Sequence, residues 1–84
     1  GLYRDELAGQ LKMFLHLPEQ GKVEVRLTIL RTGKVASVQV VSAESEINAS
    51  YVKTTLPDLT FTPFGSHFGK EAQYTFHITL MNES

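Results

Sequence analysis

The sequence predicts an α+β domain, in which two helices pack on one face of a three-stranded antiparallel sheet. Residues near 23–29 and 73–81 alternate apolar and polar side chains at the period of a half-buried strand. Residues 2–15 instead repeat apolar side chains at helical spacing. A glycine-containing turn joins the first strand to a second one. The expected order of elements is therefore α-β-β-α-β.

Length and composition set limits on the function. The chain has 84 residues, a net charge of −1 and no cysteine. This length suffices for one domain, residues 1–84, with one modest core. The charge argues against nucleic acid or an anionic membrane surface as partner, because both bind basic surfaces. Without cysteine, neither a disulfide framework nor a thiolate metal site can form.

The first segment predicts an amphipathic helix over residues 2–15. Its apolar residues form one stripe at helical spacing: Tyr3, Leu7, Leu11, Phe14 and Leu15. Such a stripe could bind a partner. We expect it to pack on the sheet instead, because a sheet with one apolar face needs a cover.

Residues 21–41 predict a β-hairpin. The apolar positions of its first strand alternate with polar ones that face solvent, Thr28 among them: Val23, Val25, Leu27 and Ile29. Residues 31–34 form the turn, where Gly33 can adopt the positive φ that hairpin loops need. The spacing slip between Val35 and Val38 predicts a β-bulge in the second strand.

A short second helix is expected over residues 49–56. Asn48 is a good N-cap residue, and Ile47 before it could pack against Val52 as a hydrophobic staple. Pro57 ends the helix. Three side chains of this segment should face the core: Tyr51, Val52 and Leu56.

The last strand, Gln73 to Met81, is predicted to lie at an edge of the sheet. The second helix returns the chain to the starting end, so the strand order becomes two-one-three. An edge strand has unpaired backbone groups along one side, and this one has no lysine, proline or bulge signal to block pairing. It can therefore accept a partner's strand, although the rest of the protein could equally cover it. The predicted partner-binding residues are Gln73, Tyr74, Thr75, Phe76, His77, Ile78 and Thr79.

Support for catalysis is weak. The histidines, His16, His67 and His77, lie in separate segments and lack the spacing of a helical metal pair. No nucleophile elbow or phosphate-binding glycine loop is present. We therefore expect a non-enzymatic domain with no metal site and no cofactor.

Two alternatives remain open. Residues 61–68 are rich in aromatic side chains and could form a binding surface or the pocket wall of a small ligand-binding or catalytic domain. In this segment Phe61 is expected in the core, and Phe64 and Phe68 are candidate secondary contacts. The chain could also be a structural domain whose sheet edge is covered by a neighbouring subunit.

Several motifs occur in an order that resembles a known family. The segment 21–29 reads G-x-V-x-V-x-L-x-I, and 33–42 reads G-x-V-x-x-V-x-V-x-S. They follow a helix that opens with a tyrosine, and they precede Ile47-Asn48 and an F-x-P motif at residues 61–63. This arrangement resembles the C-terminal domains of TonB and TolA proteins, the periplasmic tips of proteins that carry inner-membrane energy to the outer envelope of Gram-negative bacteria. The single opening helix is slightly closer to TolA.

The resemblance implies a periplasmic adaptor in a Tol/Ton-type system. It implies that this chain is the C-terminal part of a longer protein, tethered to the inner membrane only through an N-terminal anchor outside this sequence. The partners would be a periplasmic Tol component, an outer-membrane receptor, or a colicin or phage protein. In this family partners commonly add a strand to the edge assigned above to residues 73–81. We expect the isolated domain to be a monomer that binds no nucleic acid.

Overall fold

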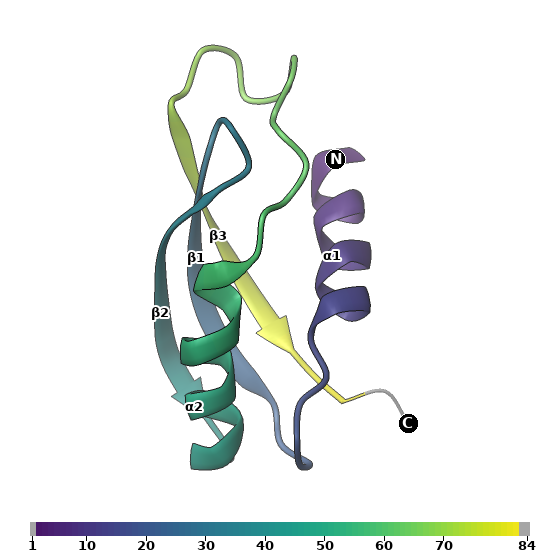
Figure 1. Ribbon diagram of the computed structural model, residues 1–84, viewed down its shortest axis with the longest axis vertical. Coiled ribbons are helices and arrows are strands. Elements are labelled where there is room, and N and C mark those ends of the chain that lie inside the picture. The colour runs from purple at the N-terminus through teal and green to yellow at the C-terminus, as the bar shows by residue number, and fades with distance from the viewer. Residues whose placement is uncertain (1, 83–84) are drawn as a thin grey trace.

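The computed structural model describes residues 2–82 and confirms the α+β class and the predicted order of elements (Figure 1). Helix α1 (Leu2–Phe14) leads into the hairpin of β1 (Val23–Leu30) and β2 (Val35–Ala43). Helix α2 (Glu46–Thr55) and the 3-10 turn η1 (Leu56–Asp58) then carry the chain back, and β3 (Gln73–Leu80) completes the sheet. Both helices contribute side chains to one core on the same face of the sheet.

The sheet has the predicted order β2-β1-β3, with both pairings antiparallel. The pairing of β2 with β1 skips Ala36 and Val41, so β2 contains two bulges. The first lies where the slip between Val35 and Val38 predicts it. The second was not predicted, because no break in the apolar pattern marks Val41.

The middle strand β1 alternates as predicted, except at one position. Val23, Val25, Leu27 and Ile29 are fully or almost fully buried against the helices. Thr28 lies on the opposite face, but only 9% of its surface is exposed, so its predicted exposure to solvent is wrong. Its hydroxyl lies 2.8 Å from the Thr75 hydroxyl on β3, and Ser37 flanks it on β2. Neighbours on both sides cover a short side chain in a central strand.

The hairpin turn confirms the role predicted for Gly33. Its φ is 95°, and a Cβ at this position would lie 2.0 Å from the Phe61 carbonyl oxygen. The Phe61 amide donates to the Gly33 carbonyl at 2.8 Å, so the turn and the later loop are in direct backbone contact. Only glycine combines this φ with such a close approach.

Helix α1 packs with the predicted stripe, but with one exception at its end. Tyr3, Leu7, Leu11 and Leu15 are buried, whereas Phe14 is 44% exposed. The prediction that Phe14 belongs to the core stripe is therefore wrong. The Leu15 amide still donates to the Leu11 carbonyl at 2.9 Å, so the chain keeps the i, i+4 spacing that brings Leu15 inward.

Helix α2 starts earlier than the sequence predicts. Ser45 is the N-cap, with its hydroxyl accepting from the Asn48 amide at 3.1 Å. The predicted Asn48 cap and the Ile47 staple are therefore wrong, and Ile47 is exposed. Asn48 is instead fully buried: its side-chain amide donates to the carbonyls of Glu19 and Gly21, both at 2.8 Å, and its carbonyl oxygen accepts from the Glu19 amide. It fastens the connection between α1 and β1 to α2.

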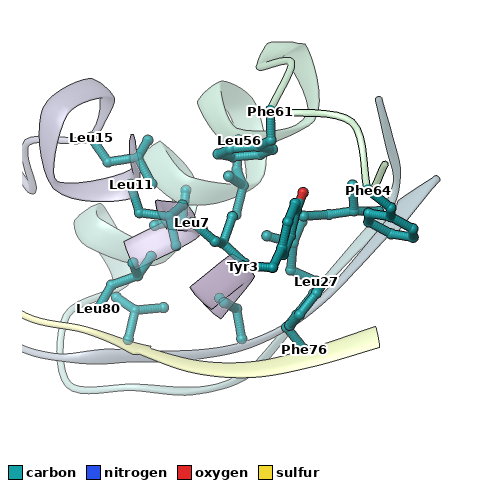
Figure 2. Packing of buried hydrophobic residues seen from close by; sticks show 14 residues of the cluster. Tyr3, Leu7, Leu11, Leu15, Leu27, Leu56, Phe61, Phe64, Phe76 and Leu80 are labelled. Carbon is teal, nitrogen blue, oxygen red and sulfur yellow. The ribbon is translucent and has the colours of Figure 1, made fainter. Parts of the chain in front are cut away.

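Side chains from both helices, η1, the loop after it, β1 and β3 meet in one core, in which aromatic rings lie around Tyr3 (Figure 2). The Tyr3 ring lies 5.3 Å from that of Phe64 and 5.8 Å from that of Phe76. Its hydroxyl donates to the Thr62 carbonyl at 2.7 Å. Helix α1 is thus attached both to β3 and to the loop before it. Val52 and Leu56 are buried as predicted, and Tyr51 is half-buried.

Candidate functional site

The outer edge of β3 is a continuous row of backbone groups. β3 pairs with β1 from Gln73 to Leu80 without a bulge. In an antiparallel pair, residues alternate between those whose N–H and C=O face the partner and those whose groups face away. The Arg31 amide donates to the Ala72 carbonyl at 2.8 Å, which fixes the phase of this alternation. Consequently Thr75, His77 and Thr79 direct their N–H and C=O groups to the open edge.

Two further contacts agree with this phase. The Leu30 amide donates to the Lys34 carbonyl at 2.8 Å, so the backbone groups of Leu30 face β2. The backbone groups of successive β1 residues then face β3 and β2 in turn. Thr28 and Thr75 touch through their hydroxyls, as expected for a pair that exchanges no backbone hydrogen bonds and lies closer together. The predicted edge residues therefore divide into two sets. Tyr74, Phe76 and Ile78 hold β3 to β1, and the other set is available to a further strand.

The opposite edge of the sheet differs. β2 is also an edge strand, but the bulges at Ala36 and Val41 interrupt the regular spacing of its backbone groups. Bulges twist an edge away from a flat pairing surface and discourage the addition of a strand. Of the two edges, only that of β3 has the unbroken register that an added strand needs.

A groove runs beside the β3 edge, on the face covered by α1. Two adjoining clefts of about 520 Å³ and about 250 Å³ share Ala8, Leu11, Ile78 and Thr79 in their walls. We call them together the α1–β3 groove. Small-molecule sites typically occupy about 300–1,000 Å³, a range that includes the larger of the two clefts. The apolar part of the groove wall comes from both elements: Leu7, Leu11, Leu15, Phe76, Ile78 and Leu80.

The charged part of the groove wall is basic. Arg4 and Lys12 line the groove, and none of the aspartate or glutamate residues within 2–82 does. His16 borders it as well, whereas the side chain of His77 lies on the outer face of the sheet. The Arg4 guanidinium lies over the Phe76 ring, 5.4 Å from its centroid, at one end. This wall was not predicted from the sequence. The four-residue spacing of Arg4, Ala8, Lys12 and His16, which places them on one side of the helix and its extension, was the available signal.

The aromatic segment 61–68 turns inward. Phe61 is buried as predicted, and Phe64 is also fully buried, so the structure does not present Phe64 to a partner. Phe68 is half-buried and stacks on the Tyr74 ring at 4.4 Å. Its φ of 62° lies in the left-handed region. The rings fill space around Tyr3 rather than forming an exposed surface.

Arg31 holds this loop closed. Its guanidinium donates to the carbonyls of Gly65 at 3.0 Å, Gly69 at 2.7 Å and Glu71 at 2.7 Å. It also lies 5.4 Å from the centroid of the Phe64 ring. One side chain thus satisfies several loop carbonyls and covers a buried aromatic residue. A structural role is sufficient to explain these contacts of Arg31.

Side chains that bind metal ions form no cluster in the described part of the chain. No cluster of three or more histidine, aspartate or glutamate side chains there could hold a metal ion. The pKa of Tyr3 is raised above 10.0, first because burial disfavours the phenolate and second because the Glu6 carboxylate is near. Its hydroxyl donates a hydrogen bond to the Thr62 carbonyl. Among residues 2–82, no helix has the length and apolarity needed to cross a membrane.

Comparisons with protein-family models, with curated proteins and with solved structures find no match to this chain.

Proposed function

We propose that this chain is a non-enzymatic protein-interaction domain that binds partners by accepting a β-strand at the outer edge of β3. The observation that carries the proposal is the coincidence of two features. Thr75, His77 and Thr79 direct backbone donors and acceptors outward, and the α1–β3 groove opens beside them. Backbone pairing supplies much of the affinity in this mode, and pockets for alternate side chains supply specificity.

We further propose that the domain works in the periplasm, in a Tol/Ton-type system that transmits energy across the envelope. The ordered motifs at residues 21–29, 33–42 and 61–63 support this proposal. So does the adoption, over nearly the whole chain, of the element order in which they occur. The partners would be a periplasmic Tol component, an outer-membrane receptor, or a colicin or phage protein.

A proline scan tests strand addition. In His77→Pro the lost N–H is one that faces the open edge, so the ladder to β1 keeps its hydrogen bonds while an added strand loses a donor. We expect His77→Pro to reduce binding by at least tenfold. The matched control His77→Ala keeps the N–H and should bind within about threefold of the wild type, since an exposed side chain alone is removed. Circular dichroism would check that both variants remain folded.

The probes are a periplasmic Tol component and an outer-membrane receptor from the organism that encodes this chain. Each would be titrated into the ¹⁵N-labelled domain. Shifts along residues 73–81 and α1 support strand addition. Shifts confined to residues 64–68 would overturn it in favour of the aromatic loop. If neither probe binds, the Tol/Ton assignment is wrong.

A further inference from the structure

The α1–β3 groove has a charge pattern that selects its occupant. Arg4 lies at the end bordered by Phe76, and Lys12 lies at the end bordered by Leu80 and Met81. Ala8 and Leu11 lie between them and leave the middle of the groove apolar. The groove is therefore apolar at its centre and basic at both ends, in a chain whose net charge is −1.

The sheet geometry determines which side chains of an added strand enter the groove. Side chains directly opposite one another in a sheet point to the same face. Residues opposite Thr75, His77 and Thr79 would point to the outer face. Residues opposite Phe76 and Ile78 would point beneath α1. Every second residue of the added strand thus meets the groove.

We propose that the strand accepted by β3 is an acidic segment whose groove-side residues alternate between apolar and carboxylate side chains, so that two carboxylates flank a central apolar residue. This inference rests on the proposed function and adds the chemistry of the partner. The carboxylates face Arg4 and Lys12, and the apolar residue lies over Ala8 and Leu11.

The spacing of the two cations matches a strand. A helical rise of about 1.5 Å per residue separates Arg4 from Lys12 by about 12 Å along α1. Two strand residues on the same face and four positions apart are separated by about 13 Å. Carboxylates at such positions reach both cations simultaneously.

A second copy of this chain fits less well. Its own β3, from Gln73 to Leu80, contains no aspartate or glutamate. Pairing two copies through β3 would place two basic groove walls near each other without a carboxylate from either strand. The occupant is therefore a different, acidic segment.

Synthetic peptides test the inference. The first is an eleven-residue capped peptide of sequence T-V-T-E-T-V-T-E-T-V-T, in which the threonines face outward and the valines and glutamates face the groove. Two further peptides would carry glutamine or lysine in place of glutamate. We expect the glutamate peptide to bind roughly 2- to 30-fold more tightly than the glutamine peptide, the range for two exposed ion pairs. The difference should shrink in 1 M salt, where the Debye length is about 3 Å.

Charge reversal is the decisive variant. The double variant Arg4→Glu/Lys12→Glu should prefer the lysine peptide. The control Lys53→Glu/Lys70→Glu makes the same change in net charge at exposed positions outside the groove wall, and should keep the preference for glutamate. Binding would be measured by calorimetry, and its location by amide shifts along β3.

The outcomes separate the two proposals. If all three peptides shift the β3 amides with equal affinity, strand addition stands and the acidic preference is wrong. If no peptide shifts β3, both are wrong. If the domain dimerises through β3 and the glutamate peptide fails to displace the second copy, the acidic occupant is also wrong.

Discussion

At the scale of single residues, Leu27 and Thr28 are adjacent on β1 and both have little exposed surface, for different reasons. Leu27 is fully buried among apolar side chains on the helix-covered face. Thr28 is covered only by the neighbouring strands and shares a hydrogen bond with Thr75. Truncating each side chain therefore removes a different kind of interaction.

We expect Leu27→Ala to lower the free energy of unfolding by about 2–5 kcal/mol. The variant loses the free energy gained by burying the removed methyl groups, and it leaves a cavity in the core. Thr28→Ala should cost about 0.5–1.5 kcal/mol, the net value of one hydrogen bond. Urea denaturation of both variants checks this order. Equal losses would mean that the two faces of β1 are packed alike, contrary to the structure.

Tyr3 couples the stability of the core to pH. Because folding raises the pKa of its hydroxyl above 10.0, the folded state favours the neutral phenol. That stabilisation is fully present below pH 10 and is lost as the pH rises through the folded-state pKa. Tyr3→Phe should cost about 0.5–1.5 kcal/mol at pH 7 through the lost hydrogen bond to Thr62.

The pH series supplies the control. The stability difference between wild type and Tyr3→Phe should stay constant from pH 7 to pH 9 and shrink above pH 10. A difference that remains constant through pH 11 would contradict the expected effect of Tyr3 ionisation on stability.

At the scale of elements, β3 should show an alternating pattern of hydrogen exchange. The amides of Phe76 and Ile78 face β1, whereas those of Thr75, His77 and Thr79 face the open edge. In the free domain we expect the second set to exchange at least about tenfold faster, because hydrogen-bonded amides need an opening event first. Exchange followed by NMR measures this directly. Uniform protection along β3 would mean that its edge is already covered.

The sequence predicted the elements better than their ends. The alternation of Val23 to Ile29 was sufficient for β1, because burial against two helices enforces the period of two. The cap of α2 was misplaced because Asn48 interacts with Glu19 and Gly21, which only the tertiary fold brings near. Phe14 and Leu15 both fit a helical stripe, and the geometry of the helix end decided between them.

The candidate site was predicted only in part. The position of β3 at an edge follows from the order of the elements, so the sequence alone could place it. Which of its backbone groups face the open edge could be determined only from the hydrogen bond between Arg31 and Ala72 in the structure. Predicting the α1–β3 groove would have required the packing distance between a helix and a strand that are far apart in the sequence. Local patterns carry no information about that distance.

At the scale of the whole molecule, the unequal edges of the sheet limit how far association through strands can proceed. A domain with two receptive edges could join others end to end and extend into a fibre, since each new copy would offer a fresh edge. Here the bulges of β2 leave one receptive edge. Once β3 has accepted a strand, neither edge strand of this domain offers a regular edge to another copy. If β3 accepts strands as proposed, the irregular strand β2 would thus limit end-to-end association of the domain.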